Sequence, residues 1–312
     1  MALSTGKFVL GRVISVVVVV VGVTGLTWLA VNALRPDLRA GDDRFILIGL
    51  VDYLQSAFLH FDFGTSSTAS NREVEELIRQ GLPADISLLA GGLAVGLFTG
   101  ITGGAYCAAR PGSFPARALE TAAALFMCAP VYVVALLSLL LFGAGLGMVV
   151  SSGPAIPTSY TSFRDSPLGW AGSLLVPWLV LGLPLAGVCL RMMRASMNEV
   201  LEEDYLRTAR AKGLSMRTVV RRHAVPSAVA PVFSLTGVTM PIVVTNLVLI
   251  EQVFSVPGVF TGMRRGIAAG DFDLLFGLTA VAAGLVAVSS LVTDLVLAWL
   301  DPRVRARAYS PR

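Results

Sequence analysis

The highest density of charged side chains in this chain lies between residues 191 and 214. After Arg191 and Arg194, the acids come first, at Glu199 and at 202–204, and the bases Arg207, Arg210 and Lys212 follow them. Charged groups of both signs on a short segment form charge-assisted hydrogen bonds with a partner surface. The chemistry that these residue types favour is ion pairing and hydrogen bonding.

The same segment is expected to form a short helix. Leu201, Tyr205 and Ala209 recur at four-residue spacing, which places them on one helical face. The acids precede the bases, as the helix dipole favours, and Gly213 can take the left-handed conformation that ends a helix. The pattern predicts an amphipathic helix at about 199–213. From the pattern alone, this helix could lie in lipid headgroups or dock on another protein.

The sequence lacks the motifs of several common classes of enzyme. There is no GxxxxGK[ST] phosphate loop, because the two lysines, Lys7 and Lys212, are not followed by Ser or Thr. No HExxH or GxSxG motif occurs, and His60 and His223 are too few for a zinc site. We therefore expect no catalytic residue, no bound metal and no nucleotide hydrolysis in this chain.

The composition indicates a membrane protein. Hydrophobic residues make up 55% of the 312 residues and charged residues 14%, and the mean hydropathy is +0.75. A bilayer core requires about 20 consecutive apolar residues per helix. Six segments meet this requirement, so the predicted fold class is an all-α polytopic membrane protein with six transmembrane helices. They are 13–34, 85–108, 119–143, 171–190, 228–250 and 275–299.

The distribution of basic residues predicts that both termini face the cytoplasm. If the N-terminus is inside, sixteen of the 24 Lys and Arg residues fall in segments on the cytoplasmic side. The net charge of +4 then has a membrane explanation, and no nucleic-acid partner is expected. The predicted location is the inner membrane of a bacterial cell.

The second predicted helix carries a stripe of glycines, Gly92, Gly96, Gly100 and Gly104. The four-residue spacing places all four on one face, where another helix can approach closely. This contact could slide during transport or be static packing.

Ionisable residues are scarce within the predicted spans. Asp294 lies in the last of them and Glu251 at the end of the fifth. Ion-coupled carriers usually use buried carboxylate or His relays, so an external energy source is favoured. The alternative of an ion-coupled secondary carrier would depend on these two acids. A membrane-bound enzyme is a third possibility, without a cluster of catalytic residues to support it.

The charged segment resembles a known family. The run 205–214, followed by His223, Pro226 and Pro231, is similar to the EAA loop of ABC importer permeases of the dipeptide/oligopeptide/nickel family. The resemblance extends to 62–66, 73–74 and 82–83, and then to 251–258, 270–271 and 300–303. It covers about four fifths of the chain.

The resemblance implies a type I ABC importer permease fold. It implies an N-terminal transmembrane helix with an extracytoplasmic segment over 1–84, a core permease domain over 85–305 and a cytoplasmic tail over 306–312. The helix at 199–213 would be the coupling helix, which docks on the ATPase. By position, this implicates Glu202, Tyr205, Arg207, Thr208, Ala209, Arg210, Ala211, Lys212 and Gly213.

The resemblance also implies the partners. They are a second, homologous permease subunit, two ABC ATPase subunits or domains that bind ATP and Mg, an extracytoplasmic solute-binding protein and the lipid bilayer. This chain itself would bind no cofactor. Peptides are the solute class that the resemblance favours, and nickel, glutathione-like compounds and sugars are the alternatives. A homodimer of this chain stays open beside the heterodimer.

Three residues near the end of the fifth helix are candidates for an extracytoplasmic gate. Glu251 could line the solute path, or it could cap a re-entrant turn with Pro257 and Gly258. The structural role is the favoured interpretation.

Overall fold

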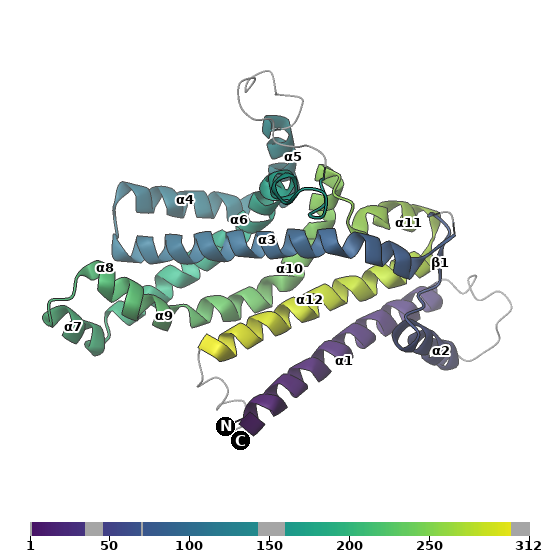
Figure 1. The fold of residues 1–312 in the computed structure, drawn as a ribbon, viewed down its shortest axis with the longest axis horizontal. Helices are drawn as coiled ribbons and strands as arrows, with labels where there is room; N and C mark the ends of the chain where they lie inside the picture. Colours follow the sequence, from purple (N-terminus) through teal and green to yellow (C-terminus); the bar gives the residue numbers. More distant parts are fainter. Residues whose placement is uncertain (1, 35–45, 70, 143–159, 301–312) are drawn as a thin grey trace. The chain divides into compact units, whose positions relative to one another are not determined.

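The computed structural model describes residues 2–34, 46–69, 71–142 and 160–300 (Figure 1). The expected tail at 306–312 and the similarity at 301–303 lie outside these residues. The first elements along the chain are α1 Ala2–Leu34, α2 Ile46–Leu59, β1 Thr65–Ser66, β2 Arg72–Glu73, α3 Val74–Ala109, α4 Phe114–Cys128, α5 Val131–Phe142 and α6 Pro167–Leu201. The rest are α7 Asp204–Ala211, α8 Met216–Val219, the π-helix η2 Val220–Ala224, α9 Val225–Ala228, α10 Ala230–Phe254, the 3-10 helix η3 Val259–Gly262, α11 Met263–Ala269 and α12 Phe272–Leu300.

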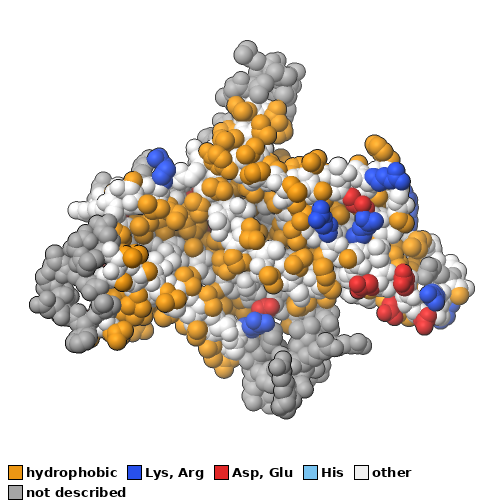
Figure 2. All heavy atoms as spheres, turned by 180° about the vertical axis from the view of Figure 1, so that it is seen from behind, with side chains coloured by type: hydrophobic (Ala, Val, Ile, Leu, Met, Phe, Trp, Pro, Cys, Tyr) orange, Lys and Arg blue, Asp and Glu red, His pale blue; other side chains and the backbone are white. Residues whose placement is uncertain are grey.

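Five of the described helices are long and apolar enough to cross a membrane, and α4 with α5 adds a sixth if the bent pair is one span. The five are Val9–Leu34 within α1, and α3, α6, α10 and Phe272–Trp299 within α12. Hydrophobic side chains cover much of the face shown in Figure 2, as expected of helices that face lipid. Acidic and basic side chains gather over the α7–α8 part of the chain in the same view.

The span predicted over 119–143 is a bent pair of helices in the structure. α4 ends at Cys128, α5 begins at Val131, and the two axes differ by 110°. The cause is the Ala129-Pro130 pair: Ala129 is extended, with ψ 129°, and the residue before a proline disfavours the helical region. Pro130 also has no N–H to continue the helix.

The described chain divides into two compact units. Unit 1 comprises the described residues of 2–85 and 257–291, and unit 2 comprises those of 86–256 and 292–300. The division predicted from the sequence, with a boundary at 84/85, stays a prediction. Residues 257–291 are grouped with the N-terminal part in unit 1.

Unit 1 contains a buried carboxylate that ties a small hairpin to the start of α12. The Oδ2 atom of Asp271 accepts hydrogen bonds from Ser66 Oγ at 2.7 Å, Thr68 Oγ1 at 2.8 Å and Thr68 N at 3.0 Å. Its Oδ1 accepts from Leu274 N at 3.2 Å, which caps the first turn of α12. Burial of Asp271 opposes its charged form, but these donors outweigh burial and hold its pKa below the ordinary value.

We expect Asp271→Asn to lower the stability of unit 1 by about 1–3 kcal/mol at neutral pH, the usual range for hydrogen bonds to a buried charge. Because the folded pKa of Asp271 is lowered, its contribution is present above the unfolded pKa and is lost as the pH falls through the folded value. Thermal unfolding of the purified protein should therefore separate the two forms at neutral pH and bring them together in acid. An equal difference at every pH would contradict this role.

Unit 2 is organised around α6, whose buried face meets α3. A Cβ atom at Gly100 would lie 2.4 Å from Cys189 Cβ, and one at Gly96 would lie 2.8 Å from Leu185 Cδ2. Gly92 and Gly104 meet α6 at 2.7 Å and 2.6 Å in the same way. The glycine stripe therefore lets the backbones of α3 and α6 approach closely. Whether the contact moves during transport stays a prediction.

Candidate functional site

The charged segment forms α7, a helix of eight residues that follows α6 after a short turn. α6 continues to Leu201, and the N–H of Glu202 closes it on the carbonyls of Glu199 and Val200. The helix expected at about 199–213 is therefore divided: its first residues complete α6, and α7 begins at Asp204. Figure 1 shows α7 next to α8, at the far end of α6.

Gly213 ends α7 in the left-handed conformation, with φ +80°. The N–H of Leu214 donates to the carbonyl of Ala209 at 3.4 Å, the bond that closes a helix through such a glycine. No atom lies within 4 Å of a Cβ built at Gly213, so the backbone conformation alone favours glycine here.

Leu206 anchors α7 to unit 2. Its side chain is fully buried in a cluster that includes Met193 and Met197 of α6, Val219 of α8 and Ala224 of η2. Short helices are marginal by themselves, so this packing is what holds α7 in place. Sequence reasoning missed Leu206, because the four-residue spacing of Leu201, Tyr205 and Ala209 pointed to a different face.

The expected apolar face is only partly present. Ala209 and Leu201 are half-buried against the Leu206 cluster, but Tyr205 is 48% exposed and lies on the outer side. The Tyr205 hydroxyl donates to Ser227 Oγ at 3.2 Å, and Ser227 donates in turn to the carbonyl of His223. Tyr205 thus connects α7 to α9.

The outer side of α7 is polar and accessible. Arg207 forms an exposed ion pair with Asp204 at 3.6 Å, and Thr208 Oγ1 donates to the carbonyl of Asp204. Such exposed ion pairs contribute little to stability, so these side chains are available to a partner. Of the residues implicated in docking, those with exposed side chains or backbone are Glu202, Tyr205, Arg207, Thr208, Ala211, Lys212 and Gly213. The side chain of Arg210 lies outside the described part of the structure.

A π-helical turn connects α8 to the long helix α10. Pro226 has no N–H, so the carbonyl of Arg222 cannot receive its usual helical bond, and the N–H of Val225 donates instead to the carbonyl of Val220. This turn keeps the chain helical from Met216 to Phe254 with short interruptions. The segment 216–228 thus joins α7 to the candidate membrane span in α10.

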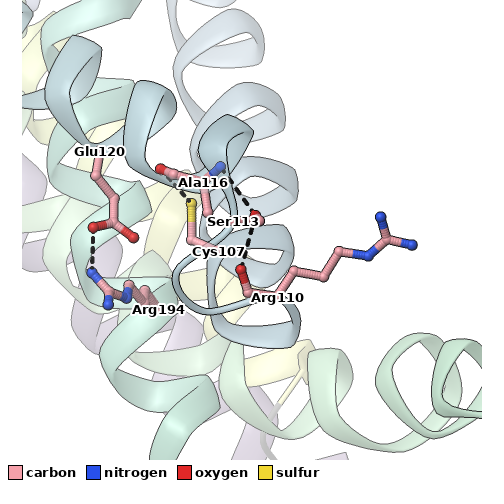
Figure 3. A network of polar contacts seen from close by, with 6 residues as sticks. All are labelled: Cys107, Arg110, Ser113, Ala116, Glu120 and Arg194. Carbon is pink, nitrogen blue, oxygen red and sulfur yellow. Dashed lines mark hydrogen bonds and ion pairs between the residues drawn. The ribbon is translucent and has the colours of Figure 1, made fainter.

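A second polar contact holds the same end of unit 2 together (Figure 3). Arg194 of α6 pairs with Glu120 of α4 at 2.7 Å. Beside it, the thiol of Cys107 contacts the carbonyl of Ala116, and Ser113 Oγ donates to the carbonyl of Arg110. These contacts fix the α3–α4 turn to the helix that leads into α7.

The three gate candidates are placed as follows. Glu251 is fully buried in the last turn of α10, and its carbonyl accepts the N–H of Ser255, which closes the helix at φ 52°. Pro257 and Gly258 belong to unit 1, and Pro257 is exposed. The backbone of Gly258 packs closely on α3, because a Cβ atom at Gly81 would lie 2.7 Å from the carbonyl carbon of Gly258. The burial of Glu251 favours the structural interpretation over an open wall of the solute path.

Within the described part of the chain, no three His, Cys, Asp or Glu side chains are grouped so that they could hold a metal ion. The arrangement at α7 offers exposed charges on a helix that is packed through one leucine. Its outer side is suited to ion pairing and hydrogen bonding with another protein.

Comparison with known proteins identifies the family. Residues 100–306 match the family described as binding-protein-dependent transport system inner membrane component. A putative peptide permease protein of Brucella ovis is 33% identical over 280 residues, which cover 90% of this chain and 86% of that protein. A probable peptide ABC transporter permease protein of Sinorhizobium fredii is 30% identical over 265 residues, 83% of this chain and 82% of that one. The dipeptide transport system permease protein of Lactococcus lactis is 32% identical over 244 residues, 78% and 76% of the two chains.

These matches confirm the resemblance, the fold class and the expectation of a non-catalytic transmembrane subunit in the inner membrane. A binding-protein-dependent system also implies a solute-binding protein and an ATPase as partners. This chain belongs to the family of binding-protein-dependent transport system inner membrane components and is a permease of an ABC transport system.

Proposed function

We propose that this chain forms half of the membrane pathway of an ATP-driven importer of di- or oligopeptides, and that α7 is its contact with the ATPase. The observation that carries the proposal is the geometry of α7: exposed charges face outward, while Leu206 fixes the helix to the core that leads into α10. Peptides are proposed as the solute because the relatives named above are described as peptide or dipeptide permeases.

The proposed assembly contains a second, homologous permease chain, two ATPase subunits or domains, and an external solute-binding protein. ATP and Mg would bind to the ATPase and not to this chain. Both termini would face the cytoplasm, because the basic residues of the segments at 110–117 and 191–222 then lie on the side that retains positive charge. α7 lies in the second of these segments.

The proposed mechanism is alternating access. ATP binding would draw the two ATPases together, α7 would follow the ATPase surface, and the packed segment after it would pass the displacement to α10. The tight backbone contact at Gly100 would keep α3 and α6 together as one body during this movement.

The test is uptake of a labelled peptide library by vesicles that contain the complete assembly and its binding protein. We expect uptake that requires ATP and survives collapse of the ion gradients. Uptake driven by an ion gradient without ATP would favour the carrier alternative. ATP-dependent uptake of nickel or a sugar, without peptide, would overturn the solute class and leave the coupling proposal standing.

A further inference from the structure

Two neighbouring cavities in unit 2 share a pair of arginines, Arg217 and Arg221. The first, of about 670 Å³, lies between the last turns of α3 and the segment α8–η2–α9. The second, of about 650 Å³, is lined by these arginines with Thr218 and Arg222. Both volumes fall in the usual range of ligand sites, about 300–1,000 Å³.

The two cavities differ in character. The first is lined mainly by apolar side chains, among them Ile101 and Ala105 of α3, Val220 of η2 and Val225 of α9. The second has arginine and threonine side chains only. A molecule that fills both would need an apolar part and a polar part joined at the level of Arg217 and Arg221.

The polar part must be anionic. A third arginine, Arg110, lines the first cavity, and its guanidinium lies 5.7 Å from the ring centre of Tyr106. Figure 3 shows that the Arg110 side chain is directed away from the Glu120–Arg194 pair. No acidic residue lines either cavity. Among the described residues, neither Arg217 nor Arg221 has a carboxylate within ion-pair distance.

The cavities also lie beside the ends of two candidate membrane spans. The candidate span in α3 ends at Ala109, directly before Arg110, and the next one in this part of unit 2 begins at Ala230, shortly after the segment that forms the other wall. Basic pockets between helices at this level bind anionic lipid headgroups, and arginine suits phosphate because its guanidinium offers paired donors.

We propose that these cavities bind one anionic phospholipid. Its phosphate pairs with Arg217 and Arg221, and an acyl chain lies along Ile101, Ala105 and Val225. An acidic side chain of the ATPase would satisfy the arginines, but it would leave the apolar cavity beside them unfilled. The lipid satisfies both parts.

The site has a consequence for coupling. Arg217 and Arg221 belong to the segment through which α7 is joined to α10, so a bound lipid would stabilise that segment against displacement from α3. The inference requires only that the chain spans a membrane. Its failure would leave the role of α7 as proposed.

The experiment uses the complete assembly, reconstituted in phosphatidylcholine vesicles with and without phosphatidylglycerol, then extracted and analysed by native mass spectrometry for retained lipid. We expect phosphatidylglycerol to be retained over phosphatidylcholine. The double variant Arg217→Gln/Arg221→Gln should reduce this retention about tenfold or more, because each basic residue contributes to attraction of an anionic headgroup.

Two further variants separate a lipid site from general charge. Thr102 is exposed and lines the first cavity, so Thr102→Trp should occupy the acyl position and reduce retention with all arginines present. Arg79→Gln removes an exposed arginine that pairs with Glu76 in unit 1 and should change nothing.

Equal retention in the wild type and the double variant would overturn the proposal. So would loss of the ATPase from the double variant with phosphatidylglycerol retained, which would assign the arginines to the protein partner. Full displacement of the lipid by glycerol phosphate would show that the apolar cavity holds no acyl chain, and it would overturn the proposal as well.

Discussion

Leu206→Asp is expected to abolish uptake while the chain stays in the membrane. Loss of a fully buried leucine side chain costs about 2–5 kcal/mol, and burial of a carboxylate without a partner adds to this cost. α7 has eight residues and cannot absorb a loss of this size, because short helices depend on tertiary packing. The helix should leave the Leu206 cluster, and its outer charges would lose their position.

Leu206→Met is the matched control. A volume-conserving apolar exchange costs less than about 1.5 kcal/mol, so uptake and copurification of the ATPase should persist. The measurement is peptide uptake with ATPase retention in the same purified preparations. Normal uptake by Leu206→Asp would show that the position of α7 on the core is irrelevant to transport.

Gly100→Ala should destabilise the protein more than a Gly→Ala substitution at a glycine whose Cβ position has no neighbouring atom. The new Cβ would lie 2.4 Å from Cys189 Cβ and 2.9 Å from the carbonyl oxygen of Ala186, so α3 and α6 would have to separate. Overpacking of this kind costs about 1–3 kcal/mol, which corresponds to a fall of several degrees in the unfolding midpoint. Thermal unfolding in detergent measures this fall.

Gly284→Ala in α12 is the control, because no atom lies within 4 Å of its Cβ position. Alanine is favoured over glycine in a helix by up to about 1 kcal/mol, so this variant should match or exceed the wild type. If both variants unfold at the same temperature, the close approach of α3 and α6 at Gly100 does not contribute to the stability of the protein.

Much of the fold could be predicted from the sequence. A helix that spans a bilayer must be long and apolar, and the spacing of residues shows which of them share one face of the helix. The glycine stripe pointed to a close helix contact, and its members Gly96 and Gly100 lie against α6. Gly213 was expected at the end of the charged helix and has the left-handed conformation there. These features are local, so the residues themselves specify them.

Features that depend on distant residues could not be predicted. Ser66 and Asp271 both lie in segments that resemble the family, but nothing in the sequence of either segment shows that the two residues, 205 positions apart, are hydrogen-bonded. Leu206 has the same difficulty, since its partners come from α6, α8 and η2. The break at Pro130 is local, because a proline inside an apolar run tends to kink its helix, but its angle of 110° could not be predicted from the residue pair.

The account depends on a contact between the outer side of α7 and the ATPase, and photo-crosslinking tests it most directly. A photoreactive residue would replace Arg207 in the assembled transporter. Arg79 is the matched control position, because it is also an exposed arginine paired with an acid three residues before it. We predict a covalent adduct between position 207 and the ATPase, and none from position 79. Adducts of position 207 with lipid alone would contradict the account.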